Sequence, residues 1–120
     1  MKVHNFKELI VWKKSIDLSI LCYKLTSTFP KDEKFGIISQ IQRAVVSIPS
    51  NIAEGCGRGF DKDLQRFLGI AMGSCYELET QMILAFKFGY LSSENLNEFE
   101  TLANEVQRML HGFYKSLKVE

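Results

Sequence analysis

Apolar residues recur at alternating intervals of three and four along most of the chain. This spacing places them on one face of an α-helix, whereas no segment shows the strict alternation of a half-buried β-strand. Three such stripes stand out, made of Ile38, Ile41, Val45, Ile48 and Ile52; of Leu64, Leu68, Ala71, Cys75, Leu78, Met82 and Ala85; and of Leu96, Phe99, Ala103, Val106, Leu110, Phe113 and Leu117. The pattern predicts long helices that each bury one stripe against neighbouring helices.

Two prolines and a glycine cluster divide the chain into four helical stretches, predicted at residues 7–28, 33–55, 61–88 and 93–117. Pro30 follows the first, Gly55 to Gly59 end the second, and Gly89 ends the third, while Asp61 and Ser92 or Ser93 are available as N-caps. Helices of matched length with short connections pack as antiparallel neighbours. The sequence therefore predicts an all-α, antiparallel up-and-down four-helix bundle that forms a single domain over residues 1–120.

The first helix differs from the others because it carries apolar residues on two opposite sides. One side holds Leu9, Trp12, Ile16, Ile20 and Tyr23, and the other holds Val11, Leu18, Leu21, Cys22, Leu25 and Phe29. A second apolar side indicates a second buried contact, which favours self-association, although a helix that crosses deep in its own core would also carry two. We expect Leu18, Leu21 and Leu25 to contact another subunit, so that a charge at Leu18 or Leu25 would disperse the assembly and spare helical content.

Charge limits the kinds of partner. The formal net charge is +1, which excludes the strong positive field of a protein held mainly by phosphates. The distribution is uneven, because residues 1–66 contain eleven basic and seven acidic side chains while residues 67–120 contain four and seven. The first half of the chain can still present a local basic patch.

Three cysteines, Cys22, Cys56 and Cys75, are odd in number and lack the CxxC spacing of a zinc site. They are typical of free thiols in a reducing compartment. No apolar run approaches the length needed to span a bilayer. We therefore expect a cytoplasmic protein with no metal and no cofactor.

Motifs of known enzyme classes are missing from the sequence. Neither histidine, His4 or His111, has a partner at metal-ligand or triad spacing, and no GxSxG, GxxxxGK[ST] or HExxH motif occurs. The glycine segment from Gly55 to Gly59 is better explained by the turn than by a phosphate site, because Asp61 and Asp63 would repel an anion there. We expect no catalytic residues.

A polar row lies opposite the apolar stripe of the second helix. It consists of Gln40, Arg43, Ser47, Asn51, Glu54 and Arg58. Pro49 lies within this stretch and predicts a kink, or a restart of the helix capped by Ser47, since proline removes a main-chain donor. The row is a solvated face, a binding surface or the wall of an oligomer's lumen. Lys13 and Lys14 are further candidates for the binding surface.

Glycines four apart, Gly69 and Gly73, share one side of the third helix. Each costs the helix about 1 kcal/mol relative to alanine. Small residues at this spacing allow another helix to approach closely. We place both in a subunit interface.

The sequence resembles a bacterial family of four-helix-bundle proteins encoded in intervening sequences of 23S ribosomal RNA genes. The resemblance rests on Phe6, Leu9 and Trp12; Phe29-Pro30 with Glu33; Gly36; Gln40-Ile41 with Arg43-Ala44; Ser47 to Gly55 with Arg58; Phe67-Leu68; Ala71; Gly73-Ser74; and Glu77 to Gln81. It implies a ring-like homopentamer similar to the accessory variability determinant of diversity-generating retroelements, a basic protein that binds nucleic acid and partners a reverse transcriptase. It implies no catalytic residues.

Three functional hypotheses follow. The first is a non-enzymatic oligomeric scaffold with RNA or an RNA-associated protein as its partner, contacted chiefly by Arg43, Asn51 and Arg58. The second is a purely structural homo-oligomer without nucleic-acid binding. The third is an enzyme at the Ser47, Asn51, Glu54 and Arg58 row, which requires a pocket and a perturbed carboxylate at Glu54.

Overall fold

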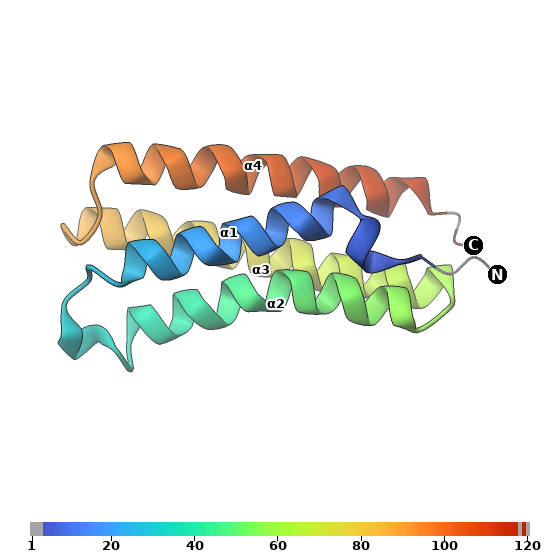
Figure 1. Cartoon of the computed structure of the whole chain (residues 1–120), viewed down its shortest axis with the longest axis horizontal. Helices are drawn as coiled ribbons and strands as arrows, with labels where there is room; N and C mark the ends of the chain where they lie inside the picture. Colours follow the sequence, from blue (N-terminus) through green and yellow to red (C-terminus); the bar gives the residue numbers. More distant parts are fainter. Residues whose placement is uncertain (1–3, 118, 120) are drawn as a thin grey trace.

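A computed structural model describes residues 4–117 and residue 119, and it shows four long helices (Figure 1). The elements are a 3₁₀ turn η1 (Phe6–Glu8), α1 (Ile10–Thr26), a 3₁₀ turn η2 (Lys31–Glu33), α2 (Ile37–Gly57), α3 (Asp61–Lys87) and α4 (Ser93–Ser116). The predicted helices are confirmed to within four residues at every end.

The four helices form an elongated antiparallel bundle of 48 × 24 × 23 Å. Each helix packs against the next one along the chain, and α4 returns to pack against α1. The α2–α3 seam is the most extensive and lies opposite the α1–α4 seam. The described residues contain no strand, so the predicted up-and-down bundle is confirmed.

Local signals set the two ends next to the α3–α4 loop, but the predicted cap of α3 is an exception. Ser92 accepts a hydrogen bond from the Asn95 amide as the N-cap of α4. Gly89, at φ +85°, ends α3 in a left-handed conformation, after which the Tyr90 amide donates to the Ala85 carbonyl. The exception is Asp61, because α3 begins at this residue and its N-cap is Phe60, without a side-chain hydrogen bond.

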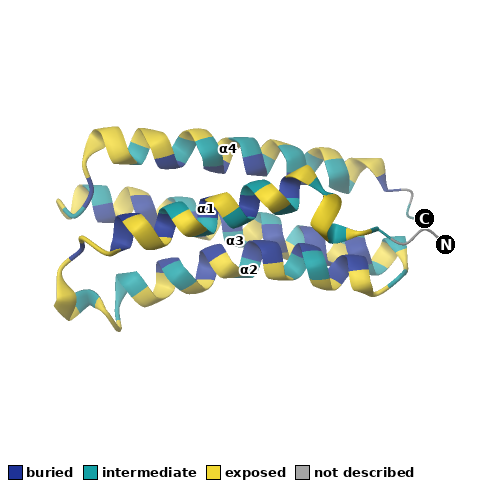
Figure 2. Ribbon diagram, in the orientation of Figure 1, coloured by how far each residue is buried: buried dark blue, intermediate teal, exposed yellow. Residues whose placement is uncertain are grey.

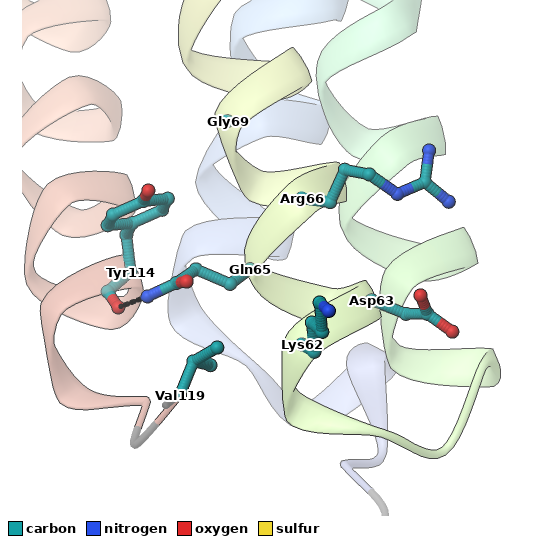
Figure 3. Close-up of a pocket in the computed structure, with 7 residues that line it drawn as sticks. All are labelled: Lys62, Asp63, Gln65, Arg66, Gly69, Tyr114 and Val119. Carbon is teal, nitrogen blue, oxygen red and sulfur yellow. Dashed lines mark hydrogen bonds between the residues drawn. The ribbon is translucent and has the colours of Figure 1, made fainter.

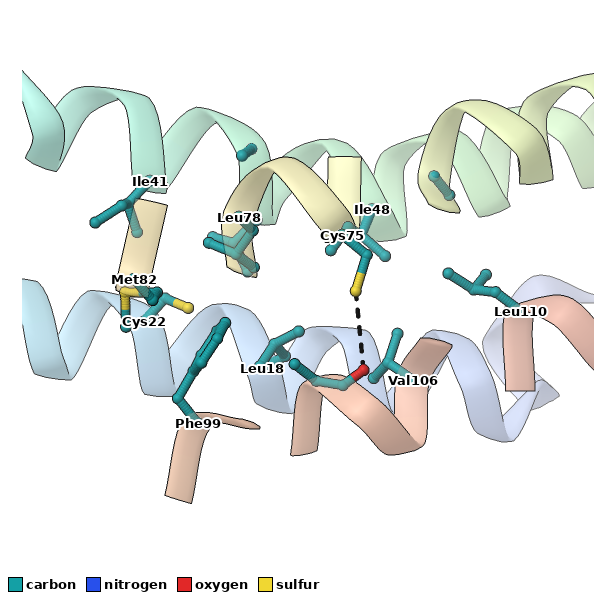
Figure 4. Close-up of a cluster of buried hydrophobic side chains, with 14 of the residues drawn as sticks. Leu18, Cys22, Ile41, Ile48, Cys75, Leu78, Met82, Phe99, Val106 and Leu110 are labelled. Atoms are coloured by element: carbon teal, nitrogen blue, oxygen red, sulfur yellow. Dashed lines mark hydrogen bonds between the residues drawn. The ribbon is translucent and has the colours of Figure 1, made fainter. Parts of the chain in front are cut away.

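The core is formed by the predicted stripes of α2, α3 and α4 (Figures 2 and 4). All seven stripe positions of α3 are buried, and elsewhere only Ile38, Leu96 and Phe113 are partly exposed. Cys75 lies in this core as a small hydrophobe, with its Sγ 3.8 Å from the Ala103 carbonyl (Figure 4). The period of three and four therefore located the core correctly.

Helix α1 corrects one prediction. Leu18 is 0% exposed and Leu25 is also buried, and both pack in the core of this single chain. Assigning them to a subunit interface was wrong, because the side with Leu18 is the one that faces α2, α3 and α4. The opposite side is the exposed one, with Ile20 64% exposed. Leu21 is half-buried beside α4, so its role in a subunit contact stays a prediction.

Pro49 does not break α2, which runs without interruption from Ile37 to Gly57. Proline leaves the carbonyl of Val45 without its usual donor, and the hydroxyl of Ser19 in α1 approaches that carbonyl at 3.4 Å. The predicted restart at Ser47 does not occur. Contact with a neighbouring helix compensates for the missing amide instead.

The loop between α1 and α2 is hydrogen-bonded to the loop between α3 and α4. Tyr90, after α3, donates a hydrogen bond of 2.8 Å to the Glu33 carboxylate of η2. This hydrogen bond raises the pKa of the Tyr90 phenol, since it stabilises the protonated form. The two loops at this end of the bundle are thereby held together.

Candidate binding surface on α2 and α3

The predicted polar row lies along the α2–α3 seam, and its middle residues are less exposed than those toward its ends. Ser47 and Asn51 are half-buried, whereas Gln40, Arg43, Glu54 and Arg58 are exposed. Ser47 shares a hydrogen bond of 2.8 Å with Ser74 of α3. Asn51 donates to the Ser47 carbonyl and hydroxyl at 2.7 and 2.9 Å. The middle of the row thus holds the two helices together, and its ends face solvent.

The α3 side of the seam also contains a buried amide. Gln81 is buried, and its Nε2 donates to Glu77 at 3.3 Å. Its Oε1 has no hydrogen-bond partner in the described part of the chain, a condition that costs free energy in a folded protein. Ser74 and Gln81 were not predicted, although each directly precedes a residue of the α3 stripe, Cys75 or Met82, and Ser74 contacts α2.

Two other candidates lie elsewhere. Lys14 extends toward α4, where its Nζ is 3.2 Å from Glu105 Oε1. It therefore does not join the row, because the α1–α4 seam is on the opposite side of the bundle from α2–α3. Lys13 is exposed on α1, a helix that does not pack against α3.

Two arginines converge on one aromatic ring where α2 turns into α3. The guanidinium carbon of Arg58 is 5.0 Å from the Phe67 ring centroid, and that of Arg66 is 4.7 Å from the same centroid. Arg58 also pairs with Glu54 at 3.0 Å, yet its side chain is 48% exposed. Each cation–π contact contributes about 0.5–1 kcal/mol at an exposed site, so both guanidiniums are held in place while accessible.

Arg66 and Phe67 were missing from the predicted surface. The signal was present, because the chain reverses after Gly57, in the short turn that contains Arg58 and Gly59. A helical hairpin brings residues on either side of its turn together. Periodicity within one helix could not show this, since it compares residues of the same helix only.

A groove of about 410 Å³ lies on the other side of α3, toward α4 (Figure 3). Gln65 donates to the Tyr114 carbonyl at 3.2 Å across it. Figure 3 shows Arg66 and Asp63 pointing away from Tyr114 toward α2. Arg66 therefore belongs with Arg58 on the α2–α3 face.

The two predicted interface glycines have open surroundings. A Cβ atom at Gly73 would meet nothing within 4 Å, and one at Gly69 would meet only Tyr114, at 4.0 Å. Packing within the chain therefore does not require either glycine. Their place in a subunit contact stays a prediction.

The three cysteine thiols lie in apolar, buried surroundings. Cys22, Cys56 and Cys75 are free and buried, and burial raises the pKa of the Cys22 and Cys75 thiols to about 12, which keeps them protonated at neutral pH. Residues 4–117 and 119 include no cluster of three or more His, Cys, Asp or Glu side chains that could hold a metal. Over the same residues, no helix is both long and apolar enough to cross a membrane.

Comparison with known families tests the resemblance that was described from the sequence. The sequence matches the family described as 23S rRNA-intervening sequence protein over residues 7–112. The chain belongs to this family. The matched residues include all of α1, α2 and α3 and most of α4. The match therefore extends over nearly the whole bundle.

A solved structure has a similar fold. The crystal structure of a protein with unknown function from the S23 ribosomal protein family of Bacteroides thetaiotaomicron is 24% identical, with a TM-score of 0.82. The alignment covers 88% of this chain and 96% of that chain. This likeness supports the four-helix fold of this chain. No curated protein matches the chain.

Proposed function

We propose that this 23S rRNA-intervening sequence protein is a self-assembling scaffold without catalytic activity that binds RNA or an RNA-associated protein through α2 and α3. The observation that carries the proposal is the pair of exposed arginines, Arg58 and Arg66, held over Phe67. Arg43 extends the same face along α2. Arginine forks recognise phosphate oxygens in two parallel hydrogen bonds.

The low net charge of the chain limits the expected affinity for RNA and its dependence on salt. With a net charge of +1, only a few phosphates are contacted. In a plot of the logarithm of affinity against the logarithm of salt concentration, each contact makes the slope more negative, by about 0.9 for duplexes and about 0.7 for single strands. Binding should therefore be moderate and only moderately salt-dependent.

Fluorescence anisotropy of a labelled structured RNA at low salt tests the RNA-binding prediction. We expect the double variant Arg58→Ala with Arg66→Ala to weaken binding at least tenfold, because two charge-assisted contacts are removed. Arg43→Ala with Arg58→Ala should weaken it comparably. Arg108→Ala, at an exposed position on α4, is the matched control and should bind like the wild type. No binding at low salt, or equal loss in the control, would contradict RNA binding by this face.

Self-assembly is supported by an unpartnered apolar surface between α1 and α2. A groove of about 350 Å³ there is lined by Trp12, Ile16, Ser19, Val46, Pro49, Ser50 and Ala53. Ile20 and Tyr23 are further exposed apolar side chains on α1, and Ile20 also lines a groove between α1 and α4. Exposed apolar surface of this kind is typical of an interaction site, and we propose that a second copy covers it, in the ring-like homopentamer that the family resemblance implies.

Sedimentation velocity tests the assembly. Ile20→Asp should shift the wild-type oligomer toward monomer, because a carboxylate would be desolvated in the contact. Asn104→Asp adds a charge at an exposed position on α4 and should leave the oligomer intact. A monomeric wild type, or an Ile20→Asp variant that sediments like the wild type, would count against this surface.

The purely structural oligomer is a second candidate, favoured by the hydrogen bonds that Ser47 and Asn51 make within the chain. In that case the polar row organises subunits and binds no ligand. The arginine variants distinguish the two functions, since a structural row predicts that they dissociate the oligomer in sedimentation and that no RNA binds to the wild type.

A further inference from the structure

An exposed aromatic side chain lies in the turn that begins with Arg58. Phe60, in the turn between α2 and α3, is 63% exposed and does not belong to the core. Its backbone is extended, and its carbonyl accepts the Leu64 amide at the start of α3. The fold uses the Phe60 backbone as the N-cap position and makes no use of most of its ring.

The guanidiniums of Arg58 and Arg66 lie close to each other. Both are held over Phe67, so their separation cannot exceed the sum of two distances of 5.0 and 4.7 Å. Phe67 itself is only 6% exposed and cannot offer its ring to a ligand. Phe60 is thus the accessible aromatic surface at a site that already presents two arginines.

Charge around the turn does not favour a purely electrostatic ligand. Arg58, Lys62 and Arg66 are matched by three acidic residues, Glu54, Asp61 and Asp63. Asp63 points to the same side of α3 as Arg66 (Figure 3). A rigid duplex presents mainly phosphates. The three acidic residues would offset the attraction of the three basic residues for those phosphates, and a duplex offers no other contact to replace it.

An unpaired nucleotide offers a contact that the balanced charge does not oppose. Its base can stack on an aromatic ring, and stacking depends little on net charge. A paired base cannot reach Phe60, because its faces are occupied within the helix. We propose, on the basis of the RNA-binding function above, that the turn binds single-stranded RNA, with a base stacked on Phe60 and the adjoining phosphates on Arg58 and Arg66.

The test compares fluorescein-labelled oligouridylate with the same strand annealed to oligoadenylate. We expect the single strand to bind more tightly than the duplex to the wild-type protein. Phe60→Ala should weaken single-strand binding by about fivefold to a hundredfold, the range of one base stacked on an aromatic side chain. Phe60→Trp should keep or improve affinity, whereas Phe60→Leu, which retains an apolar side chain without a ring, should lose it.

A matched control is available at the other end of the bundle. Phe35 is 90% exposed and lies between η2 and α2, so Phe35→Ala removes an exposed ring without touching the turn and should not alter binding. Circular dichroism of each variant verifies the fold. The slope of the logarithm of affinity against the logarithm of salt concentration should correspond to about two phosphates, roughly −1.4 for a single strand.

The possible failures are distinguishable. If the single strand and the duplex bind equally and Phe60→Ala has no effect, the stacking site is wrong while RNA binding by α2 and α3 stands. If Phe35→Ala weakens binding as much as Phe60→Ala, stacking is not specific to the turn and the site is also wrong. If neither RNA binds, the RNA-binding function itself fails.

Discussion

Leu18→Asp is expected to abolish the folded bundle. Leu18 is fully buried in the middle of α1 and is part of the core that joins all four helices (Figure 4). The variant loses the leucine contacts, which costs about 2–5 kcal/mol. It also buries a carboxyl without a partner, which costs about 1–3 kcal/mol more by mutational measures. The total approaches the 5–15 kcal/mol that stabilises a typical domain.

Far-UV circular dichroism and chemical denaturation measure this outcome. Leu18→Asp should lose most of its helical signal or unfold at far lower denaturant. Ile20→Asp is the matched control, since it places the same group two residues away on the exposed side of α1 and should keep its helical content. A Leu18→Asp variant that stays fully helical and merely changes its sedimentation would contradict the packing of α1 described above.

Gly55→Ala and Gly73→Ala are expected to change stability in opposite directions. A Cβ atom at Gly55 would lie 2.8 Å from Phe67 Cβ and 3.0 Å from Leu64 Cδ1. Alanine would therefore force α2 and α3 apart near their turn, at about 1–3 kcal/mol. A Cβ at Gly73 would meet nothing within 4 Å, so alanine should stabilise α3 there by up to about 1 kcal/mol.

Denaturant unfolding at one fixed protein concentration compares the two variants, because assembly adds to apparent stability. The Gly73 variant has a second use. If Gly73 lies in a subunit contact as the sequence predicts, Gly73→Ala should weaken assembly in sedimentation while stabilising the monomer. Equal stability of Gly55→Ala and the wild type would show that α3 can shift to accommodate a methyl group. That outcome would weaken the argument that Gly55 sets the approach of the two helices.

The sequence predicted those parts of the molecule that depend on neighbours along the chain. The stripe from Leu64 to Ala85 identified the buried face of α3, because a helix returns to the same face every three or four residues. Gly89 marked the end of α3 because a left-handed residue is required there. The resemblance around Ser47 to Gly55 identified the family correctly.

The candidate site was predicted only in part. Arg43 and Arg58 are exposed on the expected face, but Arg66, Phe67 and Ser74 were not placed beside them. Each of these residues lies on α3. Which α3 side chains meet α2 depends on how the two helices are rotated about their axes after the chain reverses. Lys14 was misplaced for the same reason, since its partner Glu105 is 91 positions away along the chain.

Four helices, their approximate limits, the stripes that three of them bury and the family could all be inferred from the sequence. The inward-facing side of α1, and the polar residues of α2 that meet α3, could be identified only in the folded bundle. Helical periodicity states which residues share a face but carries no information about the direction of that face. Direction is set by packing, and packing placed Leu18 inside, Ile20 outside and both arginines over Phe67.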